Sequence, residues 1–172
     1  MKILVSACLL GEPVRYDGRD NAAKVSDYHE QLRQWQQQGL LVPVCPESLG
    51  GLPTPRPAAE IDGGDGAAVL TGLRRIHTAS QQDVTDEFVT GARHTLNIAL
   101  KHQACCALLA ARSPSCGSDS TYNGRFSGQL TSYMGVTAAL LTQHGVRCFS
   151  PERFEQLQQY VNQQLSDNDK PL

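Results

Sequence analysis

The sequence predicts an α/β fold: a single three-layer domain with a mainly parallel sheet of about four to five strands and helices on both faces. Short apolar stretches rich in β-branched residues alternate along the chain with stretches of helical periodicity. The length of 172 residues suits one domain with a substantial core and is short for two. Neither an internal repeat nor a long linker interrupts the chain, so a second structural unit is not expected.

Four stretches are expected to be strands of this sheet. Each is short and apolar and is bounded by glycine, proline or polar residues, which is typical of a strand buried in a parallel sheet. They are 2–7 (KILVSA), 40–44 (LLVPV), 104–111 (ACCALLAA) and 146–150 (VRCFS). Two further stretches, 67–72 and 74–79, are expected to form a small hairpin or paired extended segments.

Four other stretches show the apolar spacing of amphipathic or buried helices. Ser26 is expected to cap the first helix, and Gly39 to end it. Asp83 or Thr85 is expected to cap the second helix, and Ser150 the last. The four predicted helices are 25–39, 83–103, 135–145 and 151–165.

The domain is expected to span residues 1–165, with 166–172 forming a flexible C-terminal tail. Two long loops rich in glycine, proline and serine lie inside the domain, at 45–66 and 112–134. Loops of this length in a compact domain are usually either functional or disordered.

The charge of the chain argues against nucleic acid or an anionic membrane as its partner. The formal net charge is only −2, so a small ligand is the expected partner. No apolar stretch approaches the roughly 20 residues of a membrane helix. The start, MKILVSACLL, resembles a short signal peptide, but it lacks an A-x-A-like cleavage site and is interpreted as the first strand. We therefore expect a cytoplasmic protein.

Three of the six cysteines occupy equivalent positions in the predicted fold. Cys8 directly follows the first strand, Cys45 follows the second, and Cys116 lies in the loop after the third. The carboxyl ends of parallel strands meet at one edge of a sheet, where ligands commonly bind. The three thiols are therefore expected to meet there, although scattered structural thiols are an open alternative. No C-x-x-C pair is present, so a metal site would combine distant parts of the chain.

The other three cysteines are expected to belong to the core. Cys105 and Cys106 are adjacent in a strand, so they should face opposite sides and could not bind one ion together. Cys148 lies inside a short strand. Buried free cysteines commonly serve as small apolar side chains.

Three thiolates without a fourth protein ligand favour an iron–sulfur cluster over zinc. A structural zinc ion usually has four protein ligands. A four-iron cluster held by three cysteines has one iron without a protein thiolate, which can bind a substrate atom. A three-cysteine site therefore indicates catalysis more than electron transfer.

Polar residues on the same loops strengthen this interpretation. Glu47 follows Cys45 in the motif CPES, and Ser113 precedes Cys116 in SPSC. Arg15 and Asp17 follow Cys8, and Arg56 follows Cys45. Each has a simpler explanation as a solvated carboxylate, a turn residue or a surface ion pair. Together they form a candidate site, in which Arg15, Asp17 and Arg56 are candidates for substrate contact or loop support.

Four motifs resemble those of the thiouracil desulfidase family: VSACLLGEPVRYDG, VPVCPESLGGLPTPRPAAEI, DVTDEFVTGA and RSPSCGS…YNGRFSG…MGVTAALL. The resemblance runs from residue 3 to about 150 and implies a [4Fe-4S] cluster held by Cys8, Cys45 and Cys116. It further implies non-redox desulfuration of a thiolated pyrimidine, such as 4-thiouracil or a related nucleoside or nucleotide. In that reaction the thiocarbonyl sulfur binds the open iron, and water replaces it at the ring carbon. The resemblance assigns catalytic roles to Glu47 and Ser113.

Two other functions are compatible with the same residues. A non-catalytic iron–sulfur or sulfur carrier module would use the cysteines without needing Glu47. A cysteine hydrolase would use Cys116 as its nucleophile, but none of the five histidines lies in a candidate loop.

Overall fold

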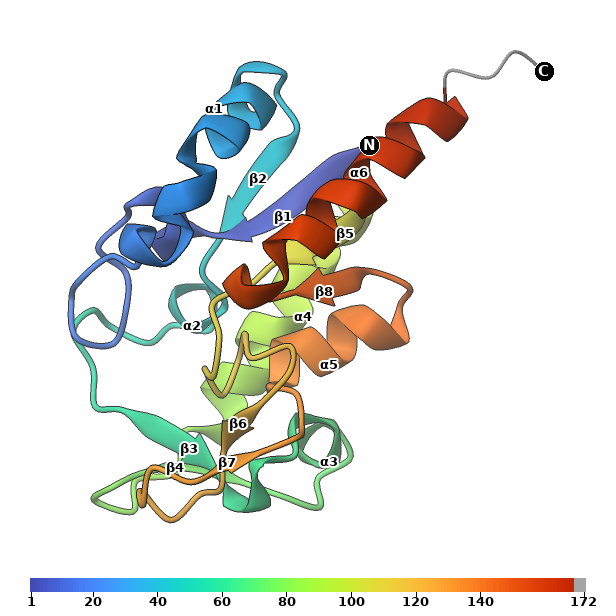
Figure 1. Ribbon diagram of the computed structural model, residues 1–172. Coiled ribbons are helices and arrows are strands. Elements are labelled where there is room, and N and C mark those ends of the chain that lie inside the picture. Colours follow the sequence, from blue (N-terminus) through green and yellow to red (C-terminus); the bar gives the residue numbers. More distant parts are fainter. Residues whose placement is uncertain (169–172) are drawn as a thin grey trace.

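The fold is centred on a four-stranded, fully parallel sheet with the strand order β2-β1-β5-β8. The computed structural model describes residues 1–168, and Figure 1 shows the sheet at its centre. The predicted α/β class with a mainly parallel sheet is confirmed, and each of the four predicted strands is present. The strands are β1 (Lys2–Ser6), β2 (Leu41–Val44), β5 (Ala104–Leu108) and β8 (Arg147–Phe149).

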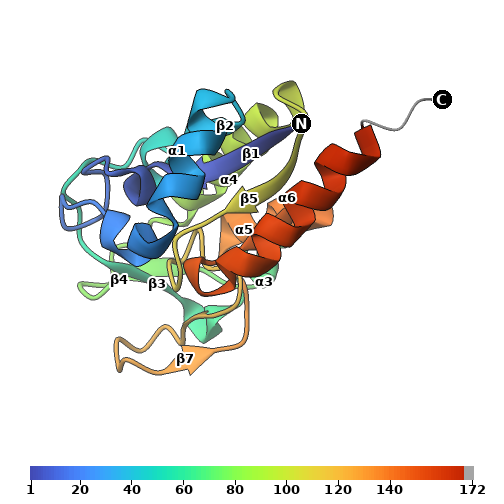
Figure 2. The same ribbon diagram turned by 45° about the horizontal axis from the view of Figure 1, so that its top comes forward.

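Helices cover both faces of the sheet, as predicted. Figure 2 shows α1 (His29–Gln37) and α6 (Phe154–Asn168) on one face and α4 (Thr85–Lys101) and α5 (Val136–Gln143) on the other. The ring of Phe154 stacks on Tyr28 and Trp35, with centroids 4.1 Å and 5.6 Å away, and so joins the two helices of the first layer. No helix within residues 1–168 has the length and apolar character needed to cross a membrane.

Several helix boundaries differ from those predicted. Ser26 lies in a 3-10 segment, η2 (Ala22–Tyr28), so it is not the cap of α1. Gly39 follows that helix with a φ of +67°, a conformation that favours glycine and ends the helix as predicted. The last helix continues to Asn168, so 166–168 are helical rather than part of a tail. The rest of the predicted tail, 169–172, lies outside the described residues.

The cap predicted for α4 is wrong, whereas the one predicted for the last helix is correct in position. The N-cap of α4 is Val84, which makes no side-chain capping bond, although Asp83 accepts a hydrogen bond of 2.9 Å from the backbone N–H of Thr85. Ser150 precedes a 3-10 turn, η4 (Pro151–Arg153), that leads into α6, although its side chain makes no capping bond.

The prediction of an extended segment at 67–72 is wrong. This stretch forms α3 (Gly66–Leu70), because Asp65 accepts hydrogen bonds from the backbone N–H groups of Ala67 and Ala68. The second stretch, 74–79, does contain a strand, β4 (Ile76–Thr78). Its antiparallel partner is β3 (Ala59–Ile61), from the long loop before it.

A small second layer of structure extends beyond the sheet, at the bottom of Figure 1. It contains α3, the β3–β4 pair and a hairpin of β6 (Thr121–Tyr122) and β7 (Leu130–Thr131). Two 3-10 turns, η1 (Ala7–Leu10) and η3 (Asp62–Gly64), complete the fold. A separate apolar cluster anchors this layer to α4 and α5. Its buried members are Ile61, Val69, Ile76, Val84, Phe88, Ala92 and Val136.

A short helix, α2 (Pro46–Leu49), directly follows β2 and packs closely on α4. Glycines make this approach possible. A methyl group added at Gly91 would lie 1.9 Å from the carbonyl oxygen of Pro46, and one added at Gly50 would lie 2.0 Å from that of Glu87. The two backbones therefore touch, which fixes α2 at the carboxyl edge of the sheet.

The substitution Gly91→Ala is expected to lower the free energy of unfolding by about 1–3 kcal/mol. At an open helical position the same change would stabilise the protein by about 1 kcal/mol, because alanine favours helix. Urea unfolding measures the effect. Asn97→Ala, at an exposed position of α4, is the matched control and should change stability by less than about 0.5 kcal/mol. Equal stability of Gly91→Ala and the wild type would contradict the close packing.

Candidate functional site

A cavity of about 510 Å³ opens at the carboxyl edge of the sheet. Its volume lies in the range of small-molecule sites. Seven of the eight predicted site residues line it: Cys8, Cys45, Cys116, Glu47, Ser113, Arg15 and Arg56. Asp17 does not line the cavity. It pairs instead with Arg15, at 3.7 Å, and accepts a hydrogen bond from the backbone N–H of Arg19.

The three cysteines reach the cavity from three separate chain segments. Cys8 lies in η1 after β1, Cys45 immediately precedes α2, and Cys116 lies in the loop after β5. Burial, and next the neighbouring Cys45, raise the pKa of Cys8 to about 11. Burial raises the pKa of Cys116 to about 12, although hydrogen bonds from Ser6 and Ser115 oppose the rise. Binding of a metal to these thiols would therefore release protons.

The spacing of these sulfurs does not suit a single metal ion. Among residues 1–168, no three histidine, cysteine, aspartate or glutamate side chains gather closely enough to hold one ion. A four-iron cluster makes a different demand, since each cysteine binds a different iron. Three thiols around one cavity are the donor set that such a cluster needs.

Serine hydroxyls donate hydrogen bonds to two of the sulfur atoms. Ser48 donates to Cys45 at 3.2 Å, whereas Ser6 and Ser115 donate to Cys116 at 3.5 Å and 3.6 Å. Hydrogen bonds to ligand sulfurs tune the reduction potential of bound clusters. Sequence reasoning missed Ser6 and Ser48. The signal for Ser48 was its place one helical turn after Cys45.

The loop that carries Cys116 is held by the start of α5. Backbone N–H groups of Val136 and Thr137 donate to the carbonyl oxygens of Pro114 and Ser115, at 2.8 Å and 2.9 Å. These N–H groups belong to the first turn of a helix and have no partner within it. A side chain at Gly117 would meet the backbone of this loop, with its Cβ 2.4 Å from Ser120 O. The turn that presents Cys116 is therefore closely packed and fixed by backbone hydrogen bonds.

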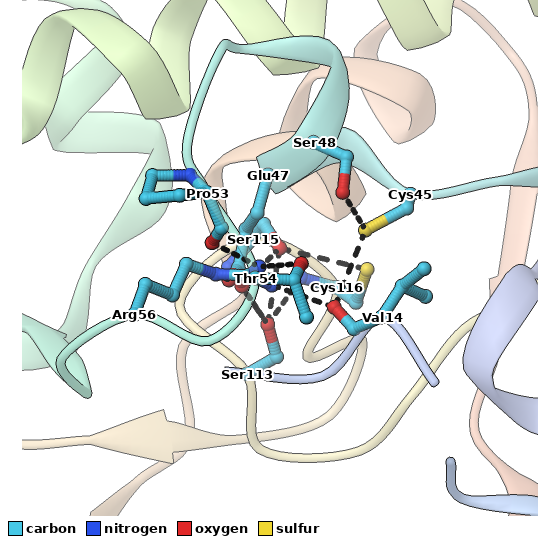
Figure 3. A network of polar contacts seen from close by, with 10 residues as sticks. All are labelled: Val14, Cys45, Glu47, Ser48, Pro53, Thr54, Arg56, Ser113, Ser115 and Cys116. Carbon is cyan, nitrogen blue, oxygen red and sulfur yellow. Dashed lines mark hydrogen bonds and ion pairs between the residues drawn. The ribbon is translucent and has the colours of Figure 1, made fainter. Parts of the chain in front are cut away.

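Glu47 and Arg56 form a buried ion pair at the wall of the cavity. Arg56 Nε lies 2.6 Å from Glu47 Oε2, with the side chains 5% and 13% exposed, respectively. The guanidinium also donates to Pro53 O, Thr54 Oγ1 and Val14 O, each at 3.0 Å (Figure 3). Four of its five N–H donors are thus used by the protein, so Arg56 positions Glu47 and the surrounding loops.

The other oxygen of Glu47 faces two serines. Glu47 Oε1 accepts hydrogen bonds from Ser115 Oγ at 3.1 Å and from Ser113 Oγ at 3.3 Å. The two hydroxyls lie 3.0 Å apart, and Ser113 Oγ also accepts from the backbone N–H groups of Ser115 and Cys116. Figure 3 shows this network next to the Cys116 sulfur. A carboxylate joined to hydroxyls in this way can accept a proton and pass it on.

The remaining cysteines lie away from the cavity, and one prediction about them is wrong. β1 pairs Lys2 with Ala104 and Ile3 with Cys106, so the pairing skips Cys105. This irregularity turns the Cys105 sulfur to within 3.8 Å of that of Cys106, so the two do not face opposite sides. Cys106 and Cys148 are buried as predicted, and Cys105 is half-buried. Among the described residues, no histidine lines the cavity beside Cys116.

The fold and the site together define an α/β enzyme whose cavity combines soft sulfur donors with groups for acid–base chemistry. The chain belongs to the 2-thiouracil desulfurase family, whose model matches residues 3–153. This confirms the resemblance found in the motifs.

Two further similarities agree with this assignment. The chain is 47% identical over 148 residues to the uncharacterized protein YbbK of Bacillus subtilis (strain 168), a match that covers 86% of this chain and 94% of that protein. Among solved structures it is similar to a [4Fe-4S]-dependent thiouracil desulfidase, TudS, with a TM-score of 0.82 and 43% identity. That match covers 94% of this chain and 97% of the other.

The substitution Arg56→Met is expected to lower the free energy of unfolding by about 3–5 kcal/mol, because it leaves the Glu47 carboxylate buried without its cation. Adding Glu47→Gln should recover part of the loss, since the amide carries no charge. Urea unfolding of the single and double variants measures both effects. The control is Arg75→Met: this arginine pairs with Asp83 at 2.8 Å on the exposed surface, and the change should cost about 0–1 kcal/mol. Equal losses for the two arginines would contradict the assigned role of Arg56.

Proposed function

We propose that this protein is a [4Fe-4S]-dependent desulfidase, which converts a thiolated pyrimidine to its oxo form and releases sulfide. The observation that carries the proposal is the meeting of three thiols and the Glu47–Ser113–Ser115 network in one cavity. Family membership and the solved structure of a [4Fe-4S]-dependent thiouracil desulfidase support it.

Cys8, Cys45 and Cys116 would hold the cluster. Their chemistry fits, because iron–sulfur clusters take cysteine thiolates and all three thiols line the same cavity. When bound, a cluster with three cysteine ligands supplies one iron free of protein thiolate, a thiophilic Lewis acid for the sulfur of the substrate. Ser48, Ser6 and Ser115 donate hydrogen bonds to the ligand sulfurs.

The reaction exchanges sulfur for oxygen without any change in oxidation state. One water is consumed, the carbon–sulfur double bond becomes a carbon–oxygen double bond, and hydrogen sulfide leaves. Glu47 is the general base that takes a proton from the attacking water. Arg56 holds Oε2, so Oε1 is directed toward the two serines. Ser113 lines the cavity and donates to Glu47 Oε1, so it can pass the proton toward the leaving sulfur.

The substrate is a thiolated pyrimidine, as the free base, nucleoside or nucleotide. Arg15 lines the cavity, and its pairing with Asp17 at 3.7 Å supports its position, so we assign it a substrate contact. All six cysteines are free thiols, which suits a reducing compartment, and we propose the cytoplasm.

Anaerobic purification and reconstitution test the function directly. The protein is expected to be brown, to contain about four irons per chain, and to convert 4-thiouracil to equal amounts of uracil and sulfide. Loss of thiocarbonyl absorbance follows the reaction. A fully loaded protein that releases no sulfide from 4-thiouracil, 4-thiouridine or the 5′-nucleotide would refute the desulfidase function. A colourless protein would refute the cluster.

A further inference from the structure

A second buried carboxylate, Glu60, lines the same cavity. Glu60 lies in β3 and is only 9% exposed. Its Oε2 accepts hydrogen bonds of 3.0 Å from the backbone N–H groups of both Gly124 and Phe126. These residues belong to the turn between β6 and β7, so the carboxylate ties the tip of that hairpin to the cavity wall.

The turn can take this form only with a particular backbone. Gly124 has a φ of +85°, and a side chain there would place Cβ 2.5 Å from Ile61 O. Phe126 has a φ of +52°, which is uncommon for a bulky residue and is held by its bond to Glu60. As a result, Phe126 and Tyr122 line the cavity, where aromatic rings suit a flat pyrimidine.

The other oxygen of Glu60 is available. Within residues 1–168, Glu60 Oε1 has no hydrogen-bond partner. This oxygen is also accessible from the cavity side. In that part of the chain, Thr137 Oγ1 is the sole side-chain polar atom that is both fully buried and unpaired, so the unpaired Glu60 Oε1 is not fully buried. Since Glu60 lines the cavity, its free oxygen can meet a ligand there.

The other two carboxylates that line the cavity in the described part of the chain are less suited to this role, because Glu47 is held by Arg56 and the side chain of Glu152 is 56% exposed. Glu152 pairs with Arg112 at 3.7 Å. A carboxylate is only an acceptor, so its natural counterpart on a neutral pyrimidine is a ring N–H. Thiolated pyrimidines carry such an N–H beside the thiocarbonyl group.

We infer that Glu60 is the residue that recognises the pyrimidine ring: Oε2 fixes the β6–β7 turn, and Oε1 accepts a hydrogen bond from a ring N–H of the substrate. The inference rests on the proposed function and adds the group that selects the heterocycle. Glu60 thus orients the ring between the aromatic wall and the proposed catalytic groups Glu47 and Ser113, and takes no part in proton transfer.

The substitution Glu60→Gln separates recognition from a purely structural role. The amide oxygen can accept from Gly124 and Phe126, which leaves the amide nitrogen, a donor, facing the cavity. The turn is thus kept and the acceptor is lost. We expect kcat/KM for 4-thiouracil to fall by about 10- to 100-fold, the value of a hydrogen bond to a charged group. Iron content and thermal stability should stay at wild-type levels, as in the control Glu155→Gln on the exposed surface of α6.

Methylated bases provide the decisive comparison. Wild-type holoenzyme should discriminate against either N1-methyl- or N3-methyl-4-thiouracil relative to 4-thiouracil, and Glu60→Gln should reduce that discrimination by about tenfold. The dissociation constants of uracil and its two N-methyl derivatives, measured by calorimetry, should follow the same pattern without turnover. A reduction of less than threefold for both methylated bases would overturn the inference.

Two further measurements separate misfolding of the variant and failure of the proposed function from a wrong role for Glu60. If Glu60→Gln does not fold, Glu60→Asp withdraws the carboxylate by one methylene and should lose the same discrimination. If wild-type holoenzyme does not desulfurate 4-thiouracil, the proposed function fails. If it does and the Glu60 variants discriminate as the wild type does, only the role of Glu60 is wrong.

Discussion

Replacement of any one of Cys8, Cys45 or Cys116 by serine is expected to remove the iron–sulfur chromophore and to reduce desulfuration of 4-thiouracil to background. Iron–sulfur clusters commonly have four cysteine ligands. The proposed cluster has only three, so the loss of any one of them is expected to release it. Serine is a hard, weakly acidic donor and replaces thiolate poorly on iron. Iron and acid-labile sulfide per chain, together with the visible spectrum of anaerobically reconstituted protein, measure the loss.

The other cysteines of the chain are the matched controls. Cys105→Ser and Cys148→Ala should retain about four irons per chain, since neither sulfur lines the cavity. Their cost should appear as reduced stability, because Cys148 is buried and its removal leaves a small void. Loss of the cluster in Cys105→Ser with its retention in Cys116→Ser would contradict the ligand assignment.

The convergence of the three cysteines could be predicted because it follows from topology. Parallel strands end at the same edge, so a residue just past each strand arrives at a shared place without any knowledge of strand order. The observed order β2-β1-β5 makes neighbours of the three strands that precede Cys45, Cys8 and Cys116. The positions of Glu47 and Ser113 could be predicted together with those of the cysteines, because each lies within three residues of one in the sequence.

The errors arise where a single local contact decides the outcome. Residues 67–72 carry no strong periodicity, and the cap from Asp65 makes this stretch helical. Cys105 faces the same side as Cys106 because the pairing with β1 skips one residue, and strand alternation alone cannot show a skipped residue. Asp17 lies near Arg15 in sequence and in space, but its side chain is used for that pair and for its own turn.

The recognition residue Glu60 illustrates what sequence reasoning could not provide. Its partners are backbone N–H groups more than sixty residues away. Almost every residue type has a backbone N–H, so the sequence does not indicate which of these groups bind a side chain. The motif YNGRFSG shows a turn, but not which carboxylate holds it. Likewise, the sequence left Arg56 as a candidate for either substrate contact or loop support, and only its four protein acceptors favour the second role.

The substitution Glu47→Gln is expected to lower kcat for 4-thiouracil by at least about 100-fold while leaving the cluster in place. Glutamine is nearly isosteric, and its amide oxygen can still accept from Ser113 and Ser115. It cannot take up a proton, so the water would lack its general base. Single-turnover desulfuration by protein with full iron content measures the chemical step, and Glu155→Gln, with the same change of charge on the exposed surface of α6, is the control.

This substitution also distinguishes an enzyme from a carrier of iron–sulfur clusters or sulfur. A carrier would depend on the three cysteines, but the carboxylate beside them would have no chemical task. Glu47 is held by a buried arginine and two serine hydroxyls, an arrangement that keeps one oxygen fixed toward the cavity at the cost of burying a charge. The free-energy cost of burying this charge favours a carboxylate that acts on the substrate over one with no chemical role. Unchanged turnover by fully loaded Glu47→Gln would rule out the proposed role of this residue, and transfer of the cluster or of sulfur to an acceptor protein would then be the activity to measure.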